Sequence, residues 1–302
     1  MERVAIFGTG LIGASVGLAL RDAGFTGVIT GWDKRRDEAQ IALDRGALTA
    51  LTDDPDEAAY ESDVIVLATP VLAVLDWMER LAPRLATGQL VTDVGSTKRE
   101  IAEAGRRLYP QKELEGRQPG TEFLPGHPMA GKERGGAELA DAGLFRGAMW
   151  LFTPDAERDD RATPVSDEWR GWVEAFGART LDLDATRHDE LCAWVSHLPQ
   201  MLSTALAALL EERFESEPEL AADLMQVGGR ALRETTRLGA SPYSMWRDVA
   251  MTNTKALSDT LLALEQELAY VRENLRTPEL REEFARANRF RLRRNESTRS
   301  AS

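Results

Sequence analysis

A histidine in a constrained segment is the first residue suited to proton chemistry. His127 lies between Gly126 and Pro128, in a stretch that we expect to be a loop following a β-sheet. The flanking residues would hold the ring in one place, and a histidine pKa near neutral pH suits a general base. A loop histidine with no chemical role is the alternative.

A serine follows another predicted strand. Ser96 belongs to the segment 93–98 (DVGSTK), directly after an apolar run at 90–94. Ligands of open α/β sheets bind at the carboxyl ends of parallel strands, so Ser96 is a candidate for substrate contact. The same residue could instead be the N-cap of the helix predicted over 96–108, and the sequence leaves both interpretations open.

Arginines gather in the second half of the chain. Arg230, Arg233 and Arg237 lie close together, and Arg247 follows ten residues later. Guanidinium groups can bind carboxylates through two parallel hydrogen bonds, so this cluster could capture an anionic substrate. Charge pairs along a helix surface are the ordinary alternative.

The N-terminal segment 8–13 (GTGLIG) predicts a dinucleotide site, because it joins a strand at 4–7 to a helix at 11–23. Gly8 allows a tight turn, Gly10 lets the backbone approach a pyrophosphate, and Gly13 permits close helix packing. The helix N-terminus favours the anion. A glycine turn without a ligand is the alternative. The cofactor-binding candidates are Gly8, Gly10, Leu11, Ile12, Gly13, Asp33, Thr69 and Pro70.

An acidic residue predicts which dinucleotide binds. Asp33 follows a predicted strand at 28–32, twenty residues after Gly13, where a carboxylate accepts hydrogen bonds from ribose hydroxyls. A carboxylate repels a 2′-phosphate, so we expect NAD rather than NADP. The basic residues at 34–36 could weaken that preference.

The elements that position these residues form two groups. Predicted strands alternate with helices through the first 184 residues, which is typical of a parallel doubly wound sheet. Long helices follow. We therefore expect an α/β fold with a Rossmann-type domain over 1–184 and an all-α domain over 185–302. The predicted strands are 4–7, 28–32, 64–68, 90–94 and 179–183, and the predicted helices are 11–23, 35–45, 96–108, 167–176, 188–214, 219–236, 243–275 and a short one from 278.

The helical half carries more apolar surface than one small domain should expose. We expect a homodimer through this domain, with a helical cap on its own first domain as the alternative. Residues 154–167 predict a solvated loop. Residues 286–302, with six arginines and one glutamate, predict a basic flexible tail.

Composition narrows the class of protein. The 302 residues carry 37 Lys+Arg and 50 Asp+Glu, a net charge of −13, which argues against a nucleic-acid partner. No apolar run reaches the roughly eighteen residues of a membrane span, and no export signal is evident. The single cysteine, Cys192, excludes an intramolecular disulfide. We expect a cytoplasmic protein.

No metal site is expected. His188 and His197 lie nine residues apart, which at about 100° per residue places them on opposite faces of a helix. One cysteine cannot form a cysteine cluster.

Several motifs recur in order along the chain: GTGLIG at 8–13, DVGSTK at 93–98, HPMAG at 127–131, HDE at 188–190, SHLP at 196–199, TTR at 235–237 and MWRD at 245–248. Taken together, these motifs resemble the prephenate and arogenate dehydrogenases of tyrosine biosynthesis. The resemblance implies NAD-dependent oxidative decarboxylation of prephenate to 4-hydroxyphenylpyruvate and CO2. Arogenate as the substrate is the alternative within this family. A β-hydroxyacid dehydrogenase and a non-enzymatic NAD sensor are the alternatives outside it.

The resemblance also implies residue roles. His127 would remove the proton of the 4-hydroxyl group, and Ser96 would hydrogen-bond that hydroxyl and His127. Gln200 stands where many members carry histidine and cannot hold a charge, which leaves the substrate choice open. The substrate-binding candidates are Arg237 for a carboxylate, Glu133 as a gate, Lys132 as a nearby positive charge, and His197, Gln200 and Trp246 as pocket residues.

Overall fold

The computed structural model describes residues 1–109, 121–132, 134–155 and 164–299. The chain divides into two compact units, Met1–Thr254 and Lys255–Ser302. These two units do not meet at residue 184, where the sequence predicts a domain boundary. The boundary at 184 therefore stays a prediction.

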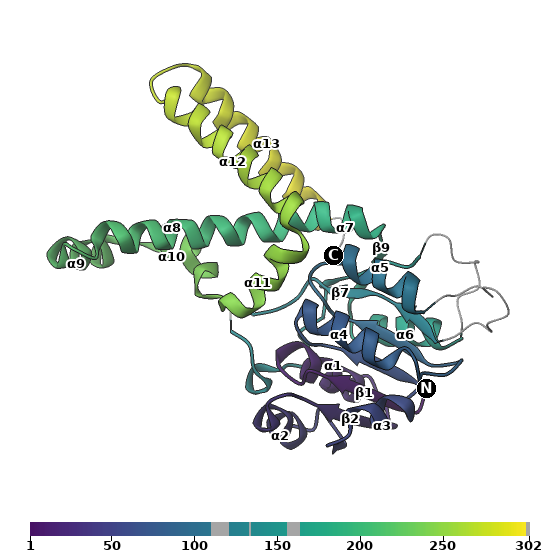
Figure 1. Ribbon diagram of the computed structural model, residues 1–302. Helices are drawn as coiled ribbons and strands as arrows, with labels where there is room; N and C mark the ends of the chain where they lie inside the picture. Colours follow the sequence, from purple (N-terminus) through teal and green to yellow (C-terminus); the bar gives the residue numbers. More distant parts are fainter. Residues whose placement is uncertain (110–120, 133, 156–163, 300–302) are drawn as a thin grey trace. The chain divides into compact units, whose positions relative to one another are not determined.

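Six parallel strands form the central sheet of the first unit, in the order β3-β2-β1-β4-β5-β6. Figure 1 labels the neighbours β1 and β2 of this sheet. This order reverses between β1 and β4, as in dinucleotide-binding folds, and it confirms the predicted Rossmann-type sheet. The strands are β1 (Arg3–Phe7), β2 (Val28–Trp32), β3 (Ala50–Leu51), β4 (Val64–Leu67), β5 (Leu90–Asp93) and β6 (Glu122–Leu124).

Helices cover both faces of this sheet. In β1, Val4 and Ile6 join one apolar cluster, whereas Ala5 and Phe7 join another. Neighbouring strand residues point to opposite faces, so strands apolar on both sides belong between two helical layers. The first cluster includes α1 (Leu11–Asp22), α2 (Arg36–Asp44) and α6 (Pro164–Ala175), and the second includes α3 (Pro55–Tyr60), α4 (Val71–Leu81) and α5 (Arg99–Leu108).

A second, smaller sheet changes the expected setting of His127. It contains β7 (Gly126–Pro128), β8 (Met149–Phe152) and β9 (Arg179–Asp182), with β7 antiparallel to β8. The prediction of a loop at His127 is wrong, since this residue lies in β7 opposite Leu151. A strand of three residues that ends in proline has no periodicity to detect.

The predicted helices of the second half are interrupted in the structure. A π-helical turn, η2, separates α7 from α8, an extended Gly228 ends α9, and Asn253 divides the helix predicted over 243–275. The helix predicted over 188–214 is therefore continuous apart from a π-helical turn, whereas the single helices predicted over 219–236 and 243–275 are wrong, because each is divided in two. The elements are α7 (Ala185–Cys192), η2 (Ala193–His197), α8 (Leu198–Phe214), α9 (Pro218–Val227), α10 (Arg230–Thr236), a 3-10 turn η3 (Arg237–Ala240) and α11 (Tyr243–Thr252).

The second unit consists of α12 (Thr254–Glu273), apart from its first residue, and α13 (Glu279–Arg299). Helix α13 runs to Arg299, so the prediction of a short final helix is wrong, whereas the flexibility of the tail stays a prediction. Among these residues, none of the helices combines the length and apolar character needed to cross a membrane.

Candidate active site

The glycine-rich segment makes the turn that the sequence predicts. Gly8 has φ +89°, and a Cβ there would lie 2.4 Å from the Ala68 carbonyl oxygen. A Cβ at Gly13 would lie 1.9 Å from the Gly8 carbonyl oxygen, whereas none of the described atoms lies within 4 Å of a Cβ at Gly10. Gly10 is the N-cap of α1 and offers no side-chain cap, so the first backbone N–H groups are available to an anion.

Asp33 lies beside this turn. Its Oδ2 accepts a hydrogen bond from the Thr9 backbone N–H at 2.7 Å, and its Oδ1 accepts one from the Arg35 backbone N–H at 2.9 Å. The side chain of Arg35 pairs with Glu38, and Arg36 pairs with Asp53. Two of the three neighbouring cations are therefore engaged with acids.

Thr69 and Pro70 follow β4, where the strand order reverses. Among the described residues, the buried Thr69 Oγ1 is one of the polar atoms without a hydrogen-bond partner. Pro70 is the N-cap of α4 and provides no side-chain cap. Leu72 instead donates its backbone N–H to Asp248 Oδ2 at 3.2 Å, which ties α4 to α11.

A buried ion pair holds the segment that contains Ser96. Lys98 Nζ lies 2.5 Å from Asp93 Oδ2, and both side chains are fully buried. Asp93 also accepts hydrogen bonds from the backbone N–H groups of Gly95 at 2.7 Å and Gly126 at 3.2 Å. The pair thereby fixes the residue that precedes His127.

Helix α5 begins at Arg99, so the predicted start at Ser96 is wrong, and so is its N-cap alternative. The N-cap is Lys98, and Asp189 accepts the first backbone N–H groups. Ser96 is half-buried. In the described part of the chain, no hydrogen bond joins Ser96 to His127, whose partners are His188 and Cys192.

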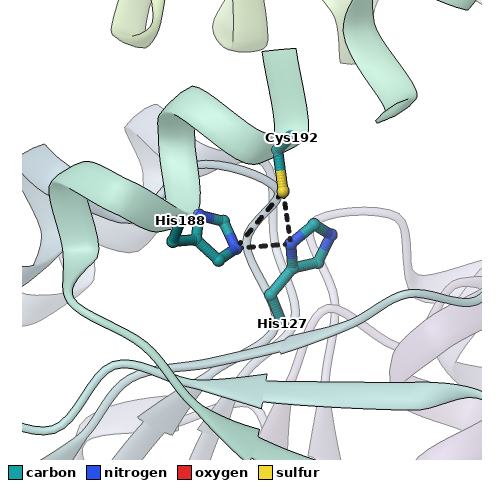
Figure 2. Close-up of side chains that lie close together, drawn as sticks. All are labelled: His127, His188 and Cys192. Carbon is teal, nitrogen blue, oxygen red and sulfur yellow. Dashed lines mark hydrogen bonds between the residues drawn. The ribbon is translucent and has the colours of Figure 1, made fainter. Parts of the chain in front are cut away.

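Three side chains meet in the centre of the site (Figure 2). Nδ1 of His127 lies 2.9 Å from Nε2 of His188, and Sγ of Cys192 lies 3.9 Å and 3.6 Å from these two atoms. His188 and Cys192 come from one helix, α7, and His127 comes from β7. Burial, helped by His188, Lys98 and His197, holds the pKa of His127 well below its usual value.

Among the described residues, His127, His188 and Cys192 form the group whose side chains could hold a metal ion, because their ligand atoms all lie within 4.8 Å of one another. The hydrogen bond between the rings accounts for the approach of the two nitrogens. Burial raises the pKa of the Cys192 thiol to about 12, which disfavours the thiolate that metals bind. The absence of a metal stays a prediction.

His197 ends the π-helical turn. Its Nδ1 lies 3.3 Å from Asn253 Nδ2, and burial lowers its pKa to about 4. The Trp246 ring meets it edge-on, with centroids 5.8 Å apart. Within the described chain, the buried atoms His197 Nε2, Trp246 Nε1 and Asn253 Oδ1 have no hydrogen-bond partner. A buried polar atom without a hydrogen-bond partner destabilises the folded protein, so these three atoms are candidates for contact with a ligand.

Gln200 supports the turn that carries Arg237. It is 3% exposed, and its Nε2 donates to the Leu238 carbonyl at 2.7 Å and to Thr204 Oγ1 at 3.1 Å. Its Oε1 accepts from Ser241 at 3.2 Å. Arg237 is exposed at the start of η3.

The remaining candidates make other contacts or lie outside the described residues. Lys132 is exposed, and its Nζ donates to the Leu139 carbonyl at 2.6 Å. Glu133 lies outside the described residues. Arg230 forms an exposed pair with Glu234 on α10, as the surface-charge alternative predicts.

Comparison with known proteins decides the family. The family described as "Prephenate dehydrogenase, nucleotide-binding domain" matches residues 16–179, more than half of the chain. The chain belongs to the prephenate dehydrogenase family. "Prephenate dehydrogenase, dimerization domain" matches residues 184–289.

Relatives of this prephenate dehydrogenase family protein include a prephenate dehydrogenase of Lactococcus lactis subsp. cremoris. It is 31% identical over 84% of the chain, and the chain spans about two thirds of its length, 65%. A cyclohexadienyl dehydrogenase of Zymomonas mobilis is 30% identical over 86% of the chain and 84% of its own. A prephenate dehydrogenase of A. aeolicus, solved with hydroxyphenyl propionate and NAD+, has a TM-score of 0.83, 26% identity and 98% coverage of both chains.

Several residues of the site were missing from the sequence prediction. Asp93 and Lys98 were visible as parts of a motif, and so was the pair His188–Asp189, but no spacing rule assigns them partners 30 to 90 residues away. Asn253 had no signal at all, because it lies inside a stretch with a continuous helical pattern. Only the fold brings it to His197.

Proposed function

We propose that this protein is an NAD-dependent dehydrogenase that converts prephenate to 4-hydroxyphenylpyruvate and CO2 in L-tyrosine biosynthesis. The observation that carries the proposal is the buried hydrogen bond between His127 and His188 in a chain of the prephenate dehydrogenase family. A buried, positioned imidazole is what removal of a hydroxyl proton requires.

The residues at the ends of β1, β2 and β4 fit a dinucleotide. The uncapped N-terminus of α1 suits a pyrophosphate, and Asp33 suits an unmodified ribose. The pairing of Arg35 and Arg36 with acids supports NAD over NADP. NAD⁺ supplies the acceptor for a hydride from the ring carbon that bears the 4-hydroxyl group. The NAD+ in the A. aeolicus relative supports this choice.

His127 acts as the base in this proposal. Its lowered pKa keeps the ring neutral, so that it can take the hydroxyl proton. Ser96 contacts the same hydroxyl from the loop after β5. Loss of the ring carboxylate as CO2 makes the ring aromatic, and the reaction is then effectively irreversible.

The substrate carboxylate binds Arg237 in this proposal, and the side chain of prephenate meets His197 and Trp246. Because Asn253 donates to Nδ1 of His197, the neutral ring carries its proton on Nε2. His197 and Trp246 then present two buried N–H donors, which suit the keto and carboxylate oxygens of prephenate. Gln200 acts on binding through the Arg237 turn rather than by direct contact.

One observation favours arogenate as the second candidate substrate. Asn253 Oδ1 is a buried acceptor beside the two donors and could accept from an ammonium group, which arogenate has in place of the keto oxygen. Glu133 stays proposed as a gate and Lys132 as a nearby positive charge.

The proposal also covers the oligomeric state, the domain boundary, the partners and the cellular location of the enzyme. The domain description of residues 184–289 supports a homodimer through the helical domain, with the division at 184–185 as the domain boundary. The net charge of −13 supports the absence of a nucleic-acid partner, and the single cysteine supports a cytoplasmic location.

The test is turnover by the purified protein. Prephenate and arogenate are each supplied with NAD⁺ or NADP⁺, and absorbance of the reduced cofactor is followed. We expect the highest kcat/KM with prephenate and NAD⁺. A higher value with arogenate would change the substrate, and no turnover with either compound would refute the proposal.

A further inference from the structure

Asp189 holds three hydrogen-bond donors. Its Oδ1 accepts from the Lys98 backbone N–H at 2.7 Å and from His188 Nδ1 at 2.8 Å, and its Oδ2 accepts from the Arg99 backbone N–H at 3.0 Å. Burial raises the pKa of this carboxyl, but the three bonds outweigh burial and lower the pKa below its usual value. Asp189 is therefore a carboxylate and can only accept hydrogen bonds.

The position of each imidazole proton follows from this carboxylate. His188 must donate from Nδ1 to Asp189, so Nε2 of the neutral His188 ring is an acceptor. Nδ1 of His127, 2.9 Å away, must then be the donor in the bond between the rings. Nε2 of His127 consequently keeps its lone pair.

We propose that Asp189 and His188 form a relay that makes Nε2 of His127 the proton-accepting nitrogen and shares the positive charge that His127 gains. This inference rests on the proposed function. In the proton transfer, the substrate O–H bond breaks and an N–H bond forms at Nε2. The O–H electron pair becomes part of the carbonyl as the C–H pair leaves as hydride, which NAD⁺ would accept when bound. His188 and Asp189 are positioning residues, since neither meets the substrate.

The charges around the two rings show why the relay matters. A proton on His127 is disfavoured by burial, by His188 and His197 from the helical segment, and by Lys98. Asp93 is bonded to Lys98 rather than to either ring, and the Cys192 thiol is neutral. Among the described residues, Asp189 is thus the carboxylate hydrogen-bonded to the histidine pair.

The proton positions can be measured without turnover. The sequence has only three histidines, so ¹⁵N-histidine NMR of the whole protein gives three rings. We expect protons on Nδ1 of His127 and His188 and on Nε2 of His197, assigned with His197→Asn and His188→Gln. A wild-type His127 that carries its proton on Nε2 would overturn the relay. This result stands even if prephenate and arogenate both fail as substrates.

Asp189→Asn tests the relay in catalysis. The amide cannot replace the carboxylate: its NH2 group opposes the Lys98 N–H and faces Nδ1 of His188 if it takes the Oδ1 position, or opposes the Arg99 N–H if it takes the Oδ2 position. Either arrangement loses the negative charge beside His188. We expect kcat to fall by about 10²- to 10⁴-fold, with an unchanged Kd for NAD⁺. The acidic limb of the kcat/KM profile should move to lower pH, because a negative charge near His127 is lost. Wild-type kcat would refute the relay.

Two further variants separate the relay from structural support. His188→Gln leaves the bonds between Asp189 and α5 in place but cannot take up charge, and we expect it to lower kcat as well. Asp22→Asn is the matched control, because it removes an exposed carboxylate that pairs with Arg146, and we expect kcat within about threefold of the wild type, a change below 1 kcal/mol. Equal losses in His188→Gln and Asp22→Asn would mean that the loss does not come from the relay.

Discussion

Asn253 donates one side-chain hydrogen to Nδ1 of His197 over 3.3 Å and the other to the Asp189 carbonyl over 2.8 Å. The second bond fixes which way the amide points, so Nδ1 of His197 must be an acceptor. The buried His197 is therefore a neutral ring near neutral pH, because burial lowers its pKa to about 4.

The stability of the protein should fall in acid because of this ring. His197 has a pKa of about 4 in the folded protein against 6.5 as its usual value. The neutral ring contributes fully to the free energy of unfolding above pH 6.5. This contribution is lost as the pH falls from 6.5 to 4, because only the unfolded chain binds the proton in that range. The loss should reach about 3 kcal/mol, measured by urea unfolding. His197→Asn should show a shallower pH dependence, and identical slopes would contradict the assignment.

Replacement of the proposed base should separate chemistry from binding. In His127→Asn, we expect kcat to fall by about 10²- to 10⁴-fold, because no group can take the hydroxyl proton. The Kd for NAD⁺, measured by calorimetry, should stay near the wild-type value. A variant with normal melting temperature and wild-type kcat would rule out His127 as the base.

Arg237→Gln should act on substrate affinity. A charged hydrogen bond contributes about 1.5–3 kcal/mol, so the KM for prephenate should rise by about 10- to 100-fold with a smaller change in kcat. The matched control is Arg213→Gln, which removes an exposed arginine of α8 that pairs with Glu217. An unchanged KM in Arg237→Gln would place carboxylate binding elsewhere.

The sequence predicts β1, β2, β4 and β5 of the six-stranded sheet because these strands carry strong local signals, but it does not predict the short strands β3 and β6. In β4, all residues from Val64 to Leu67 are apolar, and the turn after β1 needs glycine at φ +89°. The short strand of His127 was missed because three residues ending in proline follow no periodic pattern. Asp189 escaped for another reason: its partners, Lys98 and Arg99, lie about 90 residues away, and only packing of α7 on α5 brings them together.

The helical half shows where periodicity misleads. Apolar spacing continues through Asn253 and through the π-helical turn at 193–197, so both breaks look like ordinary helix. A π turn adds one residue to the helix and is often found at functional sites. His197, at the end of this turn, lies against Trp246, a contact that no helical wheel predicts.

Chelators should leave the activity unchanged. The ligand-type atoms of His127, His188 and Cys192 are already joined by hydrogen bonds, and the thiol of Cys192 is neutral. We expect the same kcat before and after dialysis against EDTA, with metal content checked by mass spectrometry. Loss of activity in EDTA and its return with Zn²⁺ would instead make these three residues a metal site.

Asp33 should control the choice of cofactor. Asp33→Asn keeps an oxygen that can accept from the Thr9 backbone N–H, but it removes the charge that repels a 2′-phosphate. Repulsion between unit charges about 4 Å apart is worth roughly 1–4 kcal/mol, so the ratio of kcat/KM for NAD⁺ over NADP⁺ should fall by about tenfold or more. The control is Asp53→Asn, which only releases Arg36 from its ion pair and should change the ratio less. If Asp53→Asn had the larger effect, the pairing of Arg36 rather than the charge of Asp33 would set the preference.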